Sequence, residues 1–170
     1  MTYIYKVATL NINGTAHCTR LRMMEEILWK HDIDIILLQV VTSTQIEKIR
    51  WYKKFLNIGA EQRGTAILVK DGLTITHIKR LPSGRGIAGT FNGTWFVNLY
   101  APSGAEKKHE RETLYNTELP YLLPTTRTDL ITAGDFNCVL SQSDTTGQKN
   151  YSRALDNIIR GYDLNDVWDT

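Results

Sequence analysis

The N-terminal part of the chain alternates between strand-like and helix-like hydrophobic patterns. Residues 3–12 are rich in β-branched and aromatic side chains, which is typical of a strand, and a Gly14-Thr15 break follows them. In residues 20–31 the apolar side chains recur at helical spacing. Residues 33–41 form a second strand-like run that is apolar on both faces and is therefore expected at the centre of a sheet. This order predicts a β-α-β unit.

The middle of the chain breaks this alternation, because four strand-like runs follow one another with no helical pattern between them. These runs are residues 64–70, 73–81, 86–91 and 94–100. Asn92-Gly93 separates the last two, and both residues tolerate the positive φ of a type I′ turn, so we expect an antiparallel hairpin there. Helical patterns at residues 106–119 and 152–161 flank a buried strand-like run at residues 129–136. The pattern predicts an α+β fold, most simply two packed sheets with helices outside.

Composition narrows the class of protein without identifying it. A length of 170 residues fits a single domain, and a net charge of +2 permits a polyanionic partner but is too small to indicate one. Two cysteines, Cys18 and Cys138, are too few for a disulfide framework, so we expect an intracellular protein of the nucleus or cytoplasm. The longest apolar run, residues 33–41, is much too short to cross a bilayer, and no membrane segment is predicted.

Polar side chains gather where three of the predicted strands end. Asp135 and Asn137 are two residues apart and therefore project from the same face of their strand. Asn11 and Asn13 repeat this spacing at the end of the first strand. A carboxylate beside a carboxamide can bind a hard cation or hold a water against an electrophile, although these residue types also favour plain turns. Tyr100 ends a third strand, where it could equally be a tyrosine at the edge of the core.

Five short stretches, in this order and at these separations, carry a resemblance to a known family. They are TLNING at residues 9–14, LLQ at 37–39, RGTAILV at 63–69, NLYAPSG at 98–104 and AGDFN at 133–137. Together they resemble the endonuclease/exonuclease/phosphatase superfamily, most nearly the apurinic-type endonuclease domain of non-LTR retrotransposons of the long interspersed class. The resemblance implies a four-layered α/β sandwich and hydrolysis of DNA phosphodiesters with Mg²⁺, or Mn²⁺ in its place. It also implies a reverse transcriptase region in the same parent polypeptide as a partner.

The resemblance also implies a role for each matching polar residue. Asp135 would orient or deprotonate the attacking water, and Asn137 and Asn11 would position the phosphate or the metal. Tyr100 would donate a hydrogen bond to the phosphate, and Asn13 is a weaker candidate for a metal ligand. Mg²⁺ suits such a site, because it binds through one or two carboxylates and substrate phosphate while keeping several waters.

Val40 departs from the family's pattern. The family's strand reads leucine-glutamine-glutamate, and its glutamate is the principal metal ligand, so Val40 stands at the position of the lost ligand. In a regular strand Gln39 points to the opposite face and cannot replace it. The chain also ends at Thr170, before the family's terminal aspartate-histidine segment, so we expect a single domain over residues 1–170 that lacks this C-terminal catalytic segment. Both departures predict an impaired or inactive nuclease.

Two other classes of function stay open. A phosphatase or an RNA-directed hydrolase of the same superfamily would keep the metal site and differ in its substrate loops. A non-catalytic nucleic-acid-binding remnant would instead use cationic and polar loop residues against phosphates, although such a loop can also be simply solvated. The candidate nucleic-acid-binding residues are Arg63, Lys79, Arg80, Arg85 and Ser103.

Overall fold

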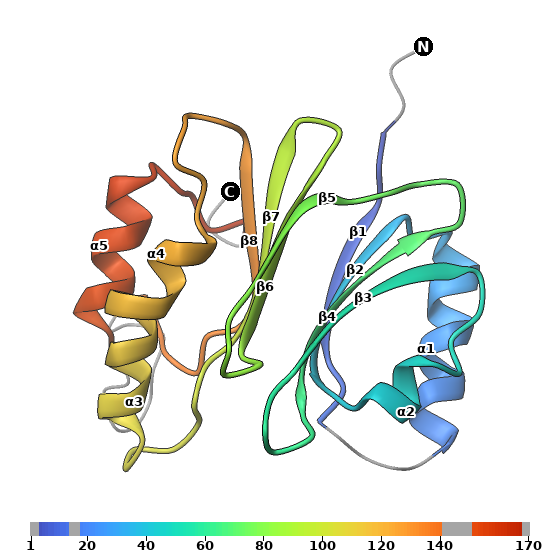
Figure 1. Cartoon of the computed structure of the whole chain (residues 1–170), viewed down its shortest axis with the longest axis horizontal. Helices are drawn as coiled ribbons and strands as arrows, with labels where there is room; N and C mark the ends of the chain where they lie inside the picture. The colour runs from blue at the N-terminus through green and yellow to red at the C-terminus, as the bar shows by residue number, and fades with distance from the viewer. Residues whose placement is uncertain (1–3, 14–17, 141–150, 168–170) are drawn as a thin grey trace.

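The computed structural model describes residues 4–13, 18–140 and 151–167, which form two four-stranded sheets packed face to face (Figure 1). Sheet A has the strand order β1-β2-β4-β3, and sheet B has the order β5-β6-β7-β8. The strands are β1 (Val7–Asn11), β2 (Ile35–Val41), β3 (Tyr52–Ile58), β4 (Gly64–Lys70), β5 (Thr76–Arg80), β6 (Gly86–Phe91), β7 (Thr94–Tyr100) and β8 (Leu130–Asp135). The β1–β2 and β7–β8 pairs are parallel and the other pairs are antiparallel, so both sheets are mixed.

Helices cover the outer face of each sheet (Figure 1). Helices α1 (Cys18–His31) and α2 (Ser43–Ile46) lie outside sheet A; α3 (Lys108–Thr113), the π-helical turn η1 (Leu114–Glu118), α4 (Leu119–Leu122) and α5 (Arg153–Gly161) lie outside sheet B. The four layers confirm the predicted α+β sandwich. No helix in the described part of the chain is long and apolar enough to span a membrane.

The described part of the protein has three hydrophobic clusters, and strand β2 contributes to two of them. Its residues alternate between the two faces of sheet A, so that Ile35 and Leu37 pack between the sheets while Ile36 and Leu38 pack towards α1. All four side chains are at most 1% exposed. Because β2 is covered on both sides, it needs apolar residues at every position, which explains its continuous hydrophobic run. A third cluster joins sheet B to its own helices.

Three predictions about the elements are corrected by the structure. Strand β3 was not predicted, because Lys53 and Lys54 hide its hydrophobic pattern; it is an edge strand, where lysines are common. The strand expected over residues 3–12 is limited to β1, and Tyr3 lies outside the described residues. The helix expected over residues 106–119 begins at α3 and continues through η1 and α4. The Asn92-Gly93 hairpin is confirmed, with φ angles of 47° and 83°.

Candidate active site

The ends of β1, β2, β7 and β8 meet at one rim of the sandwich, the lower end in Figure 1. Parallel pairing places the end of β1 beside that of β2, and the end of β7 beside that of β8. An open hollow of about 480 Å³ lies between the two pairs, and we call it the rim hollow. Polar residues that line the rim hollow are Thr9, Asn11, Gln39, Asp135 and Asn137. The structure therefore brings together Asn11, Asp135 and Asn137, three of the strand-end residues that the sequence singled out.

A hydrogen bond between the two sheets organises the rim hollow. Asn11 Nδ2 donates to Asp135 Oδ2 at 2.7 Å, joining residues that are 124 positions apart in the chain. The other carboxylate oxygen, Oδ1, accepts the backbone N–H of Asn137 at 3.1 Å. Asn137 Nδ2 in turn donates to the carbonyl oxygen of Ala101 at 2.8 Å. The carboxylate is thus held in one orientation from two directions, and its place at the rim is fixed.

Asn13 contributes to a turn at this rim. Its backbone N–H donates to Asn11 Oδ1 at 2.8 Å, and its φ of 50° lies in the left-handed region that asparagine tolerates. The side-chain oxygen of Asn11 therefore already accepts one hydrogen bond. This is the turn geometry that the sequence left open as an alternative to metal binding. Asn13 as a metal ligand stays a prediction.

Gly134 lets β8 approach β7 closely next to the carboxylate. Its φ of 141° is a conformation that side chains rarely adopt, and a Cβ atom here would lie 1.9 Å from the carbonyl oxygen of Leu99. Asn137 follows with a φ of 48° and turns the chain away. The backbone therefore requires the glycine and favours the asparagine of the Gly-Asp-Phe-Asn sequence, whatever chemistry the two polar side chains perform.

A buried amide pair lies behind the rim hollow and ties the sheets together. Gln39 is 1% exposed and Asn98 of β7 is fully buried. Gln39 Nε2 donates to Asn98 Oδ1 at 2.7 Å, and it also lies within hydrogen-bonding distance of Thr9 Oγ1 and the Leu37 carbonyl. Asn98 Nδ2 donates to two carbonyl oxygens of sheet A, those of Leu38 and Ala66, both at 2.9 Å. Buried amides of this kind fix one relative placement of two sheets, because no other register satisfies them.

Val40 sits in a β-bulge at the end of β2. The pairing of β2 with β4 shifts between Gln39 and Val41, and Val40 has a φ of 57°, which is unusual for a β-branched residue. Gln39 lines the rim hollow, so the expectation that it points away from the site is wrong. Val40 is 2% exposed and is not among the described residues that line the hollow. That Val40 marks a lost metal ligand stays a prediction.

The donor set of the rim hollow does not suit a metal ion held by protein groups alone. Of the described residues that line it, Asp135 is the one carboxylate, and both of its oxygens already accept hydrogen bonds. Across residues 4–13, 18–140 and 151–167, no group of three histidine, cysteine, aspartate or glutamate side chains is placed to hold a metal. A single carboxylate fits Mg²⁺ only where phosphate and water supply the remaining oxygens.

The predicted nucleic-acid-binding residues divide into two groups. Arg63 lies on the loop between β3 and β4, and Arg85 lies on the loop between β5 and β6. The two loops are neighbours at the rim: Gly84 of one is so close to Gly59 of the other that a Cβ atom on Gly84 would lie 2.2 Å from the Gly59 nitrogen. The guanidinium carbon of Arg85 lies 5.3 Å from the centre of the Tyr100 ring. Tyr100 pairs in register with Asp135, but it is not among the described residues that line the rim hollow.

The three other candidates are not among the described residues that line the rim hollow. The ammonium of Lys79 donates to the carbonyl oxygens of Tyr121 and Leu123 at 2.9 and 3.2 Å, at the end of α4. It therefore stabilises a helix end, and its role as a phosphate contact stays a prediction. Arg80 Nε donates to the Leu56 carbonyl at 2.8 Å, and Ser103 is exposed in the loop after β7.

Cys138 and Tyr115 are neighbours of the site that the sequence did not single out. Cys138 lines the rim hollow, and its sulfur lies 3.5 Å from the hydroxyl of Tyr115. The Tyr115 hydroxyl donates to the carbonyl of Phe136, between the two polar residues of the strand end. Burial raises the pKa of both the Cys138 thiol and the Tyr115 phenol, so both stay protonated at neutral pH. Tyr115 lies on η1, and no sequence pattern predicts a π-helical turn.

Solved structures share this fold. An AP endonuclease from Archaeoglobus fulgidus aligns with a TM-score of 0.70 and 19% identity over 94% of this chain and 69% of its own. TDP2 from C. elegans aligns with a TM-score of 0.62 and 20% identity over 84% of this chain and 50% of its own. D. rerio TDP2, complexed with a single-strand DNA product, aligns with a TM-score of 0.66 and 15% identity over 97% of this chain and 69% of its own.

No protein-family model matches the sequence, and no curated protein matches it. The chain spans about half the length of the C. elegans TDP2 structure that it matches. At these identities the likeness concerns the fold alone. The chain has the endonuclease/exonuclease/phosphatase fold.

Proposed function

We propose that this chain is a DNA-directed phosphodiesterase domain of the endonuclease kind, encoded by a non-LTR retrotransposon, whose metal-dependent hydrolysis is impaired. The hydrogen bond between Asn11 and Asp135 carries the proposal. The Asp135 carboxylate lines one hollow together with the carboxamides of Asn11, Gln39 and Asn137, at the rim where strand ends of both sheets meet. The shared fold with an AP endonuclease supports a nucleic-acid phosphodiester as the substrate class.

Each rim residue has a part that its position supports. Asp135 is placed to orient a water or to accept its proton, because its carboxylate opens on the rim hollow and is held by two N–H donors. Arg63 and Arg85 supply positive charge on the neighbouring loops, where a DNA backbone would lie. Mg²⁺, when bound together with phosphate, supplies electrostatic stabilisation of the charge that develops on the phosphate oxygens.

The impairment is proposed from the single carboxylate of the rim hollow. Val40 stands where the resembling family has a glutamate, and hydrocarbon offers no ligand to a hard cation. Restoring the carboxylate with Val40→Glu is therefore expected to tighten Mg²⁺ binding about ten-fold or more, equivalent to roughly 1.4 kcal/mol. Calorimetric titration measures this directly, independently of any enzyme activity.

The experiment includes matched controls. Gln62→Glu adds the same charge on an exposed rim loop and should leave Mg²⁺ affinity unchanged, while Asp135→Ala in the Val40→Glu background should abolish the gain. Plasmid nicking is measured on the same proteins. Equal Mg²⁺ affinity of the original chain and Val40→Glu would contradict the place given to Val40. Robust Mg²⁺-dependent nicking by the original chain would contradict the impairment.

A second candidate is DNA binding without hydrolysis, which the lone carboxylate of the rim hollow favours. Phosphate contacts make DNA affinity fall with salt, by a log–log slope of about −0.9 per phosphate neutralised. Arg63→Ala and Arg85→Ala should each reduce that slope by about one. A salt titration in which neither variant changes the slope would exclude the rim loops as the DNA-binding surface.

The retrotransposon context is proposed from the sequence stretches TLNING, NLYAPSG and AGDFN. It predicts a reverse transcriptase region in the same polypeptide, which reading the codons around this sequence in its source genome would test. A superfamily phosphatase or an RNA-directed hydrolase is the remaining alternative. Affinities of the Val40→Glu protein for DNA, RNA and a phosphate monoester, measured side by side, separate the three substrate classes.

A further inference from the structure

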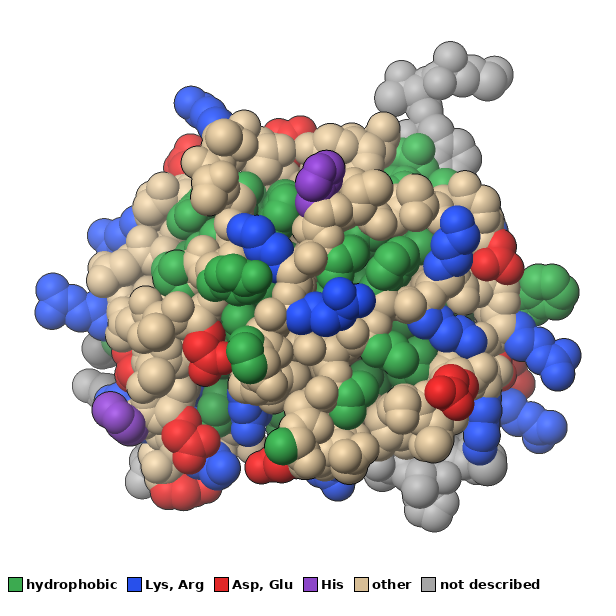
Figure 2. Space-filling view, in the orientation of Figure 1, with side chains coloured by type: hydrophobic (Ala, Val, Ile, Leu, Met, Phe, Trp, Pro, Cys, Tyr) green, Lys and Arg blue, Asp and Glu red, His purple; other side chains and the backbone are tan. Residues whose placement is uncertain are grey.

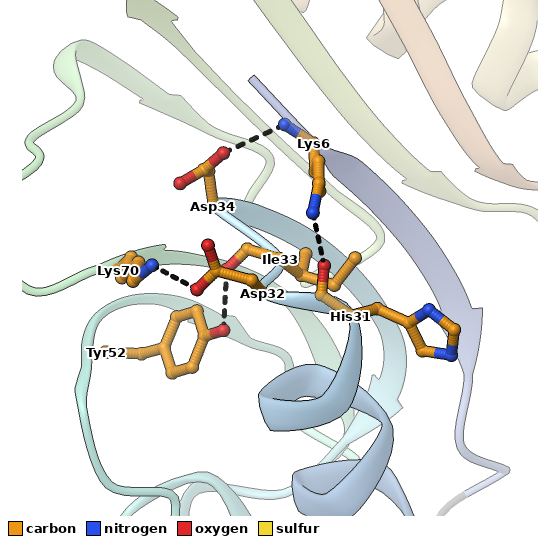
Figure 3. Close-up of polar contacts among 7 residues, drawn as sticks. All are labelled: Lys6, His31, Asp32, Ile33, Asp34, Tyr52 and Lys70. Carbon is orange, nitrogen blue, oxygen red and sulfur yellow. Dashed lines mark hydrogen bonds and ion pairs between the residues drawn. The ribbon is translucent and has the colours of Figure 1, made fainter. Parts of the chain in front are cut away.

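A second groove, of about 840 Å³, lies between α1 and the start of β3, at the opposite end of sheet A from the rim hollow. Tyr52 at the start of β3 pairs with Lys70 at the end of β4, whereas the rim end of this pair is Ile58 and Gly64. Figure 3 shows part of the wall of this groove. There Lys70 forms an ion pair with Asp32, and the phenol of Tyr52 donates to the Ile33 carbonyl at 2.7 Å. The groove has a fixed polar wall.

Two tryptophans that line this groove are mostly exposed. Trp29 of α1 is 85% exposed and Trp51, just before β3, is 73% exposed. Large aromatic side chains normally bury most of their surface, because this is their main contribution to stability. Two exposed indoles on one groove are therefore better explained by a ligand than by folding.

The backbone at Trp51 supports the same conclusion. Its φ of 67° lies in the left-handed region, which is a genuine outlier for a bulky residue and costs on the order of 1–3 kcal/mol. The strained conformation is held by the backbone N–H of Asp71, which donates to the Trp51 carbonyl at 2.9 Å. The chain thus maintains a costly conformation at a side chain that projects into solvent. Such strain is typical of residues that bind something.

Cations and acids both line the groove, and its cations are Arg22 of α1, Lys48, Arg50 and Lys70. The stretch KIRWYKK, residues 48–54, carries Lys48, Arg50, Lys53 and Lys54 and no acid. Figure 2 shows lysine and arginine side chains gathered on the side of the molecule where β3 and α2 lie. The acids that line the groove are Glu25, Glu26, Asp32 and Asp71, of which Asp32 is paired with Lys70. Asp71 lies beside Trp51, so an anionic ligand is favoured at Lys48 and Arg50 and disfavoured at Glu25 and Glu26.

We propose that this groove binds single-stranded nucleic acid, with unpaired bases stacked on Trp51 and Trp29 and the phosphates beside Arg50 and Lys48. Indole faces stack on any unpaired base, and interleaved cations bind the backbone between bases. A duplex hides its base faces, so the two indoles select the single strand. The site lies at the other end of sheet A from the rim hollow and needs no hydrolysis, so it is independent of the proposed function.

Fluorescence anisotropy with a short labelled oligothymidylate tests the proposal on the full chain. Trp51→Ala and Trp29→Ala should each weaken binding about five- to 150-fold, the equivalent of about 1–3 kcal/mol per stacked base. Trp51→Phe, which keeps an aromatic face, should weaken it less than Trp51→Ala. Arg50→Ala should make the salt dependence shallower, by a log–log slope of about 0.7 for one phosphate on a single strand. Because both indoles are exposed, these variants should keep the melting temperature of the original chain.

The controls separate this groove from other surfaces. Tyr121→Ala removes an aromatic ring that is 59% exposed but belongs to α4, and it should leave affinity for oligothymidylate unchanged. Arg63→Ala reports any binding at the rim loops, and the losses caused by Trp51→Ala and Trp29→Ala should persist in the Arg63→Ala background. Equal affinity for a blunt duplex, no binding, or binding that falls in Arg63→Ala and is indifferent to Trp51→Ala and Trp29→Ala would each overturn the proposal.

Discussion

Replacing Asn98 by alanine should destabilise the protein more than its loss of apolar contact suggests. The side chain is fully buried and donates to the carbonyl oxygens of Leu38 and Ala66, each at 2.9 Å, while accepting from Gln39. Alanine leaves both carbonyls without this donor in a site that water does not reach. Each unsatisfied buried group costs about 1–3 kcal/mol, so the expected loss is about 2–6 kcal/mol. That is a large part of the 5–15 kcal/mol by which domains are typically stable.

Urea denaturation followed by circular dichroism measures this loss, and thermal melting should show a fall of very roughly 4–24 °C for a domain of this size. Asn116→Ala makes the same chemical change at an exposed position and should stay within about 0.5 kcal/mol of the original chain. Combining Asn98→Ala with Gln39→Ala gives a double-mutant cycle, and the pair should couple by about 0.5–3 kcal/mol. If Asn98→Ala and Asn116→Ala have the same melting temperature, the cross-sheet amide pair does not hold the rim in place.

Three further substitutions test individual contacts. Gly134→Ala should destabilise the protein by more than about 3 kcal/mol in urea denaturation, because the added Cβ meets the Leu99 carbonyl at 1.9 Å in a strained conformation. Ser152→Ala removes the N-cap hydrogen bond of α5 and should cost about 1 kcal/mol by the same measurement. The hydrogen bond and charge of Lys70 lower the pKa of Asp32, so their stabilisation is present above the unfolded pKa of about 3.9 and is lost as the pH falls through the lower folded value. In Lys70→Met the pKa of Asp32, followed by NMR, should rise towards its ordinary value.

The fold was largely predictable because its local signals agree with its tertiary structure. The run at residues 33–41 is apolar on both faces, and β2 is covered on both sides. The Asn92-Gly93 pair forms the turn that its φ angles allow. Strand β3 could not be found, because it is an edge strand in which Lys53 is exposed and Lys54 Nζ donates to the Glu47 carbonyl, so two adjacent lysines interrupt its apolar pattern. Edge position is a property of the sheet, and no local pattern reports it.

The sequence predicted those residues of the candidate site that lie at strand ends, and it did not predict the contacts made by other segments. Asn11, Asp135 and Asn137 meet because parallel strands bring their C-terminal ends to one rim, which the sequence indicated. The contacts of Lys79 depend on where α4 ends relative to β5, a relation between distant segments. The groove at Trp51 was missed for a similar reason: Trp29 is far away in the sequence, and a left-handed backbone is not visible in residue type.

The bulge at Val40 comes after Gln39, which shares the inter-sheet face of Ile35 and Leu37, and it sharpens the test of the lost ligand. In a regular strand Val41 would share a face with Gln39, but Val41 packs with Leu38 on the α1 side, so Val40 is the inserted residue. A carboxylate introduced at this buried position lacks a cation unless a metal supplies one, and a buried unpaired charge is strongly destabilising. Val40→Glu should therefore melt below the original chain in EDTA and recover with Mg²⁺, since a ligand bound only by the folded state stabilises it by about 2.7 kcal/mol at one hundred times its Kd. Thermal melts with and without Mg²⁺ measure both effects. A substituted protein that melts lower and does not respond to Mg²⁺ would show that the bulge directs residue 40 away from the phosphate site.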